Sequence, residues 1–146
     1  MRRVISVGIA TFAAAAAIAG YAIAQDDMVA KRQALMKDNG AQATIAGQMI
    51  QGATPFDAAA AKAAMEKIAA NAAEIPADFP AGSEGGDALP AIWANFADFE
   101  AKAAALKTAA DAAAAATGGG VEAFGPAFGA VGQACGACHQ TYRKAS

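Results

Sequence analysis

Two cysteines and one histidine near the C-terminus place the strongest constraint on what this chain can fold into. Cys135, Cys138 and His139 form the pattern Cys-x-x-Cys-His, and they include every cysteine and the only histidine of the 146 residues. On a helix, positions i, i+3 and i+4 share one face, so two thiols and an imidazole can meet the same ligand. The pattern is the attachment signal for c-type haem, with both thiols linked to the porphyrin and His139 bound to the iron.

Three other kinds of site use closely spaced cysteines, and each fits this chain less well. A thioredoxin-like redox pair needs a βαβ context, whereas the sequence on both sides of the motif is typical of helix. Structural zinc takes four ligands, and the chain offers two cysteines and one histidine. A disulfide would leave the adjacent His139 unexplained. We therefore expect one covalently bound haem c.

The N-terminal residues have the pattern of a secretory signal peptide. Arg2 and Arg3 supply positive charge, an apolar stretch follows, and Ala22-Ile23-Ala24 is a small-residue cleavage site. The apolar stretch is short for a membrane span, which needs about 20 residues. We therefore expect residues 1–24 to be removed after Ala24 during export to the periplasm, which leaves no stable membrane anchor.

Residues 25–146 are long enough to form one domain with its own hydrophobic core. Without Arg2 and Arg3 the chain has nine lysines and arginines against 13 aspartates and glutamates, a net charge of −4 with His139 neutral. No basic patch suggests binding to nucleic acid. Two free thiols in an oxidising compartment would normally pair with each other, unless haem has consumed them.

Alanine, the strongest helix former, dominates the chain, and glycine and proline gather between segments. We expect four helices and no strand, over residues 27–52, 54–75, 90–118 and 121–144. Thr54 is expected to cap the second helix, with Pro55 at its first position. Four such helices with mostly short loops predict an all-α fold, an up-down-up-down antiparallel bundle. The haem would then lie near the C-terminal end of the fourth helix.

The fourth predicted helix has an apolar stripe that includes the motif. Its members follow one another at steps of four and three residues, which is typical of a helix face that packs into a bundle core. They are Phe124, Phe128, Val131, Cys135, Cys138 and Tyr142. The thiols are therefore expected to face the interior of the bundle.

The antiparallel arrangement limits which methionine can bind the iron opposite His139. His139 lies seven residues before the C-terminus and Met36 lies 11 residues after Gln25, so the two fall at similar heights. Met49 lies 13 residues beyond Met36, about 20 Å further along the helix at a rise of about 1.5 Å per residue. Met36 is the best candidate for a second axial ligand, although a core methionine beside the porphyrin would fit the same position.

The whole expected domain resembles a class II cytochrome c, a secreted four-helix bundle with its haem motif near the C-terminus. Residues 31–40, Lys-Arg-Gln-Ala-Leu-Met-Lys-Asp-Asn-Gly, resemble the first helix of the low-spin branch, the cytochrome c-556 group. The resemblance implies that Met36 binds the iron, as the methionine at that position does in this branch. In the high-spin branch, cytochrome c′, the position is usually apolar and the sixth site is open, and a few members carry a methionine that does not bind.

The resemblance also implies roles for residues around the haem. Arg32 and Gln33 match residues near the haem propionates in relatives, and arginine pairs well with carboxylates; the alternative is a solvated helix surface. Arg143 follows His139 by four residues and would cover the proximal side of the imidazole, or complement the helix dipole. Trp93 either packs against the porphyrin edge or belongs to the core.

Two functions of different classes are compatible with these features. Ligation by His139 and Met36 would close both axial sites, which predicts a low-spin, monohaem electron-transfer protein that meets redox partner proteins transiently. A Met36 that does not bind would leave the sixth site open to nitric oxide or carbon monoxide. A peroxidase would need a polar distal acid–base group, and no second histidine exists, so we expect no catalytic residues. Class II relatives often pair through their first two helices, which would make this chain a homodimer.

Overall fold

Five α-helices make up most of the chain that the structure describes. The computed structural model gives the backbone of residues 12–145 and the side chains of residues 27–145. In chain order the elements are α1 Phe12–Ile50, α2 Ala58–Glu74, the 3₁₀ turn η1 Ile75–Asp78, α3 Ala91–Ala94, α4 Phe96–Ala116, the 3₁₀ turn η2 Thr117–Gly119 and α5 Gly120–Tyr142. Arg2 and Arg3 of the expected signal peptide lie outside the described residues.

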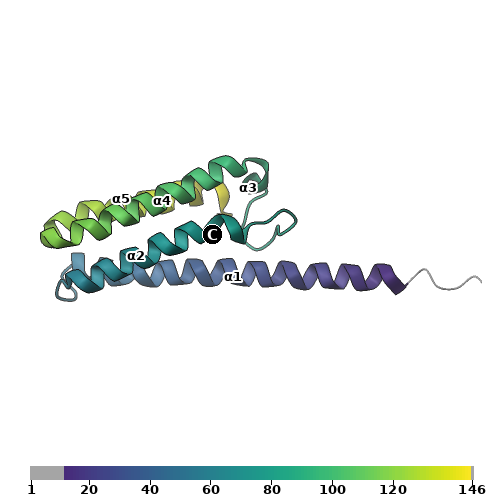
Figure 1. Ribbon diagram of the computed structural model, residues 1–146, viewed down its shortest axis with the longest axis horizontal. Coiled ribbons are helices and arrows are strands. Elements are labelled where there is room, and N and C mark those ends of the chain that lie inside the picture. The colour runs from purple at the N-terminus through teal and green to yellow at the C-terminus, as the bar shows by residue number, and fades with distance from the viewer. Residues whose placement is uncertain (1–11, 146) are drawn as a thin grey trace, which may run out of the picture.

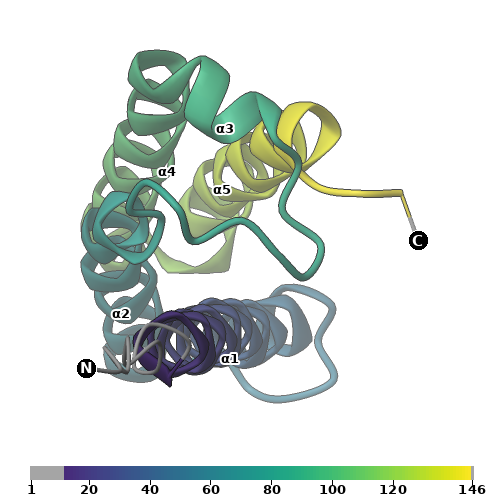
Figure 2. The same cartoon turned by 90° about the vertical axis from the view of Figure 1, so that its right-hand side faces the viewer.

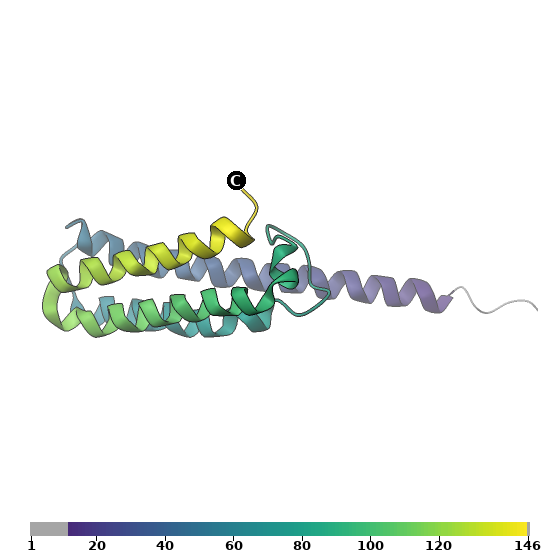
Figure 3. The same ribbon diagram turned by 90° about the horizontal axis from the view of Figure 1, so that it is seen from above.

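The four long helices form an antiparallel bundle. Helices α1 and α4 run in one direction, and α2 and α5 run in the other (Figures 1 and 3). Helix α2 packs along α1 and α4, and α4 packs along α5, whereas α1 and α5 approach each other at few positions (Figure 2). The predicted all-α, up-down-up-down bundle is confirmed. Within residues 12–145 the strand-like pairing is limited to an isolated bridge between Ala88 and Arg143.

Helix α1 begins earlier than the sequence analysis predicted. A start after Asp26 and Asp27 was expected, but the helix already runs from Phe12, because the alanine-rich residues before Asp26 themselves favour helix. The expected cleavage after Ala24 would fall within α1 and stays a prediction. None of the helices in the described part of the chain is long and apolar enough to cross a membrane.

Helix α2 begins three residues later than predicted. Asp57, not Thr54, is the N-cap, with an extended backbone at φ −117° and ψ 108°. Its carboxylate accepts hydrogen bonds from the backbone N–H groups of Ala59 (2.9 Å) and Ala60 (3.0 Å). A carboxylate at this place satisfies two otherwise unpaired amides and complements the helix dipole. The prediction of Thr54 as the cap and Pro55 as the first helical residue is therefore wrong.

The single helix predicted over residues 90–118 is divided at Asn95, which separates α3 from α4 with φ −137° and ψ 55°. Two long-range polar contacts accompany the break. The indole Nε1 of Trp93 donates to the carbonyl of Pro80 at 3.0 Å, and the hydroxyl oxygen of Tyr142 lies 3.4 Å from the carbonyl oxygen of Asn95. Asparagine is a weak helix former, so these tertiary contacts decide the local conformation.

The core has two regions, one packed through small side chains and one through aromatic rings. Five alanines on α2 and α4 are at most 1 % exposed, which lets the two helices approach closely: Ala61, Ala64, Ala72, Ala110 and Ala113. An aromatic cluster joins η1, α3, α4 and α5, with neighbouring ring centroids 4.7 to 6.0 Å apart: Phe79, Trp93, Phe96, Phe99 and Tyr142. Such pairs stabilise a core beyond the area they bury.

The loop between η1 and α3 is tied to the end of α5. The backbone N–H of Lys144 donates to the carbonyl of Asp87 at 2.8 Å, and its Nζ donates to the carbonyl of Gly86 at 2.7 Å. Gly86 has φ +60°, and a Cβ there would lie 2.9 Å from Cγ1 of Val29 on α1. Glycine is therefore required where this loop lies against α1.

Replacing Met65 with alanine should lower the free energy of unfolding by about 2–5 kcal/mol. The Met65 side chain is fully buried between helices, so its removal leaves a cavity. Denaturant unfolding of both proteins measures the difference. Ile45, which is 38 % exposed, provides the control: Ile45→Ala should change stability by about 0.5 kcal/mol. Equal costs for the two variants would contradict this description of the core.

A hydrogen bond between α5 and α4 gives the fold a defined pH dependence. The Tyr142 hydroxyl donates to Oδ2 of Asp98 at 2.6 Å. This bond, with burial and the Asp98 charge, raises the pKa of Tyr142 from 10 to about 12. Because the folded-state pKa is the higher one, the contact stabilises the fold fully below about pH 10 and is lost as the pH rises to about 12.

We expect the difference in melting temperature between wild type and Tyr142→Phe to report this contact. It should stay constant up to about pH 10 and shrink between about pH 10 and 12, where the wild-type hydroxyl ionises. Thermal unfolding followed by circular dichroism at a series of pH values measures it. A difference that persists unchanged to pH 12 would mean that Asp98 does not hold the phenol proton.

Candidate haem-binding site

A cavity of about 480 Å³ lies where α1 faces α5. The α1 wall follows one helical face: Val29, Arg32, Gln33, Met36, Asn39, Gly40 and Ala43. The α5 wall follows another: Phe128, Val131, Gly132, Cys135, Cys138, His139, Tyr142 and Arg143. Side chains from α2, η1, α3 and α4 complete the lining, and the loop at residues 85–88 also borders the cavity. The cavity therefore opens between two neighbouring helices that approach each other at few positions.

The thiols and the imidazole of the motif share the α5 wall of this cavity. Cys135, Cys138 and His139 are all half-buried and line it together, and both cysteines are free thiols. Burial raises the pKa of both thiols. Burial also lowers the pKa of His139 below its usual 6.5, and the charge of Arg143 lowers it further. The imidazole is therefore neutral at physiological pH, which is the state that binds a metal.

Met36 reaches the same cavity from α1. The structure describes the side chains of four methionines, and Met36 is the one that lines the cavity. Met49 and Met65 are buried elsewhere in the core. The similar height of Met36 and His139, which was inferred from the antiparallel arrangement, agrees with their places in the lining.

Arg32 is a buried cation in the cavity wall. Its side chain is 7 % exposed, although a solvated position was one of the two expectations. Its Nη2 donates to the carbonyl of Ser83 at 2.8 Å and its Nη1 to the Ser83 hydroxyl at 3.3 Å. The guanidinium also lies 4.7 Å above the ring of Phe79. Burial lowers the pKa of Arg32, while the charges of Asp78 and Glu84 oppose that shift, so the group stays a cation.

An ion pair beside Arg32 fixes the η1 turn against α1. Nζ of Lys31 lies 2.5 Å from Oδ1 of Asp78, a carboxylate that is 1 % exposed. This bond raises the pKa of Lys31, so the pair is intact at neutral pH. Asp78 precedes Ser83 by five residues. The ion pair therefore holds the segment that contains Ser83 close to Arg32 on α1.

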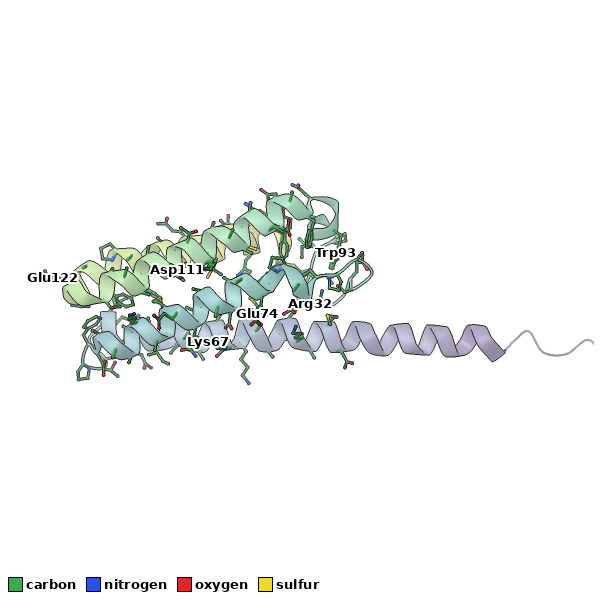
Figure 4. All side chains as sticks on the ribbon, in the orientation of Figure 1. Arg32, Lys67, Glu74, Trp93, Asp111 and Glu122 are labelled. Carbon is green, nitrogen blue, oxygen red and sulfur yellow. The ribbon has the colours of Figure 1, made fainter. Side chains whose placement is uncertain are left out.

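The other predicted haem neighbours differ in position. Gln33 and Arg143 are exposed but line the cavity. Trp93 is not among the lining residues; its ring lies 6.0 Å from that of Phe79 and 6.0 Å from the Arg32 guanidinium. Figure 4 shows Arg32 and Trp93 at one end of the bundle, with Glu122 at the other. Trp93 therefore packs against Phe79 and Arg32, and its place at the porphyrin edge stays a prediction.

Two polar residues in the cavity wall were missed by the sequence analysis. Asn39 on α1 is 8 % exposed, and Lys102 on α4 is half-buried with its Nζ 3.7 Å from Oδ2 of Asp98. Helical spacing contained a signal for both. Asn39 follows Met36 by three residues, and Lys102 follows Phe99 by three, so each shares a face with a residue expected in the core.

The lining fits haem c by its size and by its chemistry. A volume of about 480 Å³ lies within the range of about 300–1,000 Å³ that is usual for ligand sites. Apolar side chains such as Ile68, Leu106 and Phe128 form much of the wall. Two thiols one helical turn apart, with a neutral imidazole on the same face, supply the donors that covalent haem attachment requires.

Comparisons with known proteins agree with this site. The family model described as Cytochrome C' matches residues 27–143. Cytochrome c-556 of Agrobacterium fabrum is 47 % identical over 116 residues, which cover 79 % of this chain and 80 % of the relative. Cytochrome c' of Alcaligenes xylosoxydans xylosoxydans is 41 % identical over 97 residues, which cover 66 % of this chain and 76 % of the relative.

A solved structure with the same fold is the nitric oxide complex of a leucine-to-alanine variant of cytochrome c prime from Alcaligenes xylosoxidans. It superposes with a TM-score of 0.78 at 35 % identity and covers 84 % of this chain and 97 % of that one. The family match, the relatives and the shared fold agree with the cavity and its motif. The chain therefore belongs to the cytochrome c′ family, whose members bind haem c covalently through the cysteine pair, here Cys135 and Cys138.

Proposed function

We propose that this protein is a periplasmic electron carrier with one low-spin haem, whose iron is bound by His139 and Met36. The observation that carries this proposal is the shared cavity. His139 lines it from α5, and Met36 is the methionine, among those described, that lines it from α1. A thioether and an imidazole are a known axial pair in c-type cytochromes.

The residues of the cavity have distinct tasks in electron transfer. Cys135 and Cys138 hold the haem on α5, and the haem supplies reversible one-electron chemistry at its iron. His139 and Met36 would hold the iron, so that no exchangeable ligand would enter or leave when the redox state changes. Apolar walls would limit access of water to the haem, and together with binding by methionine they would favour the reduced state and raise the potential.

The polar side of the cavity suits the acidic groups of the haem. Arg32 is held in place by Ser83 and Phe79 before any ligand arrives, so it can pair with a propionate without losing further side-chain freedom. Gln33 on α1 and Arg143 on α5 line the same cavity and remain exposed. These three residues would fix how the haem edge meets solvent.

Export and partner binding follow from the same assignment. The family match begins at residue 27, close to the cleavage proposed after Ala24, which supports residues 25–146 as the functional domain. The relatives are named as cytochromes, and we assign no catalytic residue. Electrons would leave through the haem edge to proteins that bind transiently. Pairing of two copies of the chain stays a prediction.

Gas binding is the second candidate function. Two solved relatives are described as complexes, one with nitric oxide and one with carbon monoxide. If Met36 only packs beside the porphyrin, the same apolar cavity would leave an open sixth site for such a ligand. The two functions therefore differ in whether one sulfur binds the iron.

Spectra of the purified holoprotein and of Met36→Leu decide between them. We expect low-spin ferric iron in the wild type at neutral pH. Met36→Leu keeps the side-chain volume but removes the sulfur, and should give high-spin iron. Its ferrous form should bind carbon monoxide at least tenfold more tightly, a change of about 1.4 kcal/mol, because no ligand has to be displaced. Optical and electron-paramagnetic spectra and carbon monoxide titration measure these changes.

Met49→Leu is the matched control, because Met49 lies on the same helix and is buried outside the cavity. Its spectra should equal those of the wild type. High-spin ferric iron in the wild type at neutral pH would overturn the electron-carrier assignment and favour gas binding.

A further inference from the structure

Asn39 is a buried polar side chain in the α1 wall of the cavity. It is 8 % exposed and shares the lining with Met36, Gly40 and Ala43 of the same helix. A primary amide has one oxygen that accepts and one nitrogen that donates two hydrogen bonds. Such a group is costly to bury unless it is paired, so its presence beside Met36 requires a physical reason.

A neighbouring carboxylate fixes which way the Asn39 amide faces. Nδ2 of Asn71 on α2 donates to Oδ2 of Asp38 at 2.8 Å and to Oδ1 of Asn39 at 2.9 Å. Asp38 also accepts from Nε2 of Gln42 at 3.1 Å. Both of its oxygens are therefore acceptors, and Asn71 presents its nitrogen to it. Asn39 must then present its oxygen to Asn71.

The Asn39 nitrogen is therefore left on the side away from α2. Nδ2 has no hydrogen-bond partner among residues 27–145 and is not a buried unpaired atom, so it reaches the open space of the cavity that Asn39 lines. Side chains on a helix lean toward its N-terminus, so Asn39 covers the turn that carries Met36, three residues earlier. A thioether sulfur is a weak hydrogen-bond acceptor. Donor and acceptor thus lie on one helical face and border the same cavity.

We propose that Asn39 is a positioning residue, whose Nδ2 donates a hydrogen bond to the Met36 sulfur when that sulfur binds the haem iron. The inference rests on the proposed ligation by Met36. A thioether sulfur has two lone pairs, of which one would accept the N–H and the other would bind the iron. Methionine has three rotatable side-chain bonds, so this bond would hold a flexible ligand in a single conformation and reduce the entropy lost on ligation.

The variant Asn39→Leu tests the proposal in the holoprotein. It removes the donor, while Asn71 keeps its bond to Asp38. Carbon monoxide must displace Met36 from ferrous iron, so its affinity should rise about fivefold, which corresponds to about 1 kcal/mol for one hydrogen bond. In proton NMR spectra of the ferrous protein, the single Met36 methyl signal of the wild type should broaden or split, because more than one conformation is populated.

Gln42→Leu is the matched control for a purely structural effect. Gln42 bonds to the same Asp38 carboxylate but does not line the cavity. It should leave carbon monoxide affinity and the methyl signal unchanged. If Gln42→Leu raises the affinity as much as Asn39→Leu does, the polar cluster acts only through the fold and the proposal is wrong.

The wild-type protein provides a test that does not depend on folding of any variant. Nuclear Overhauser contacts between the Asn39 amide protons and the Met36 side chain are expected in the ferrous state, and their absence would overturn the proposal. The spectra of the wild type and of Met36→Leu distinguish a failure of the Asn39 role from a failure of Met36 ligation. Low-spin wild type with unchanged Asn39→Leu would refute the role of Asn39 alone, whereas high-spin wild type would refute Met36 ligation and this inference together.

Discussion

Two thiols and one imidazole must reach a single cofactor from one helical face, and the rest of the bundle is arranged to permit this. Cys135, Cys138 and His139 can do so only where α5 borders open space and not another helix. Helices α2 and α4 accordingly pack closely through alanines, whereas α1 stands back from α5 across a cavity of about 480 Å³. The close packing of α2 against α4 therefore holds the bundle together while α1 and α5 stay apart.

The two facing walls of the cavity, on α1 and α5, also differ in charge. The imidazole is kept neutral by burial and by Arg143, so it is ready to bind metal. Arg32 is a cation that is buried in the opposite wall of the cavity, on α1, where a carbonyl, a hydroxyl and an aromatic ring hold it. A neutral ligand on α5 and a fixed cation on α1 match a cofactor with a metal at its centre and carboxylates at its edge.

The sequence predicted those parts of the structure that depend on periodicity. The inward face of α5 follows from steps of three and four residues, the four-helix arrangement from the alanine-rich segments and the breaks between them, and the place of Met36 from its height in an antiparallel bundle. It failed where competing local signals depend on tertiary contacts. Thr54 and Asp57 are both acceptable caps, and Asp57 is used. The helix is interrupted at Asn95, where Trp93 bonds to Pro80 and the Tyr142 hydroxyl lies near the Asn95 carbonyl.

Burial of single polar residues was also beyond a sequence-based prediction. Arg32 is enclosed by Ser83 and Phe79, which lie about 50 residues later, and no local pattern reports that enclosure. Asn39 follows Met36 by one helical turn, so its position could have been predicted, but its orientation depends on Asn71 of another helix. Position along a helix is a local property, whereas the direction of an amide is set by its partners.

The wide spacing of α1 and α5 has a consequence for how the polypeptide reaches its final stability. Apolar side chains on both walls, among them Phe128 on α5 and Ala43 and Met36 on α1, border the open space of the cavity, where a closely packed helix would otherwise supply contacts. Porphyrin carbon would supply those contacts, so part of the free energy of folding is deferred to the covalent maturation step. The prosthetic group is then as much a component of the hydrophobic interior as any residue that the gene encodes.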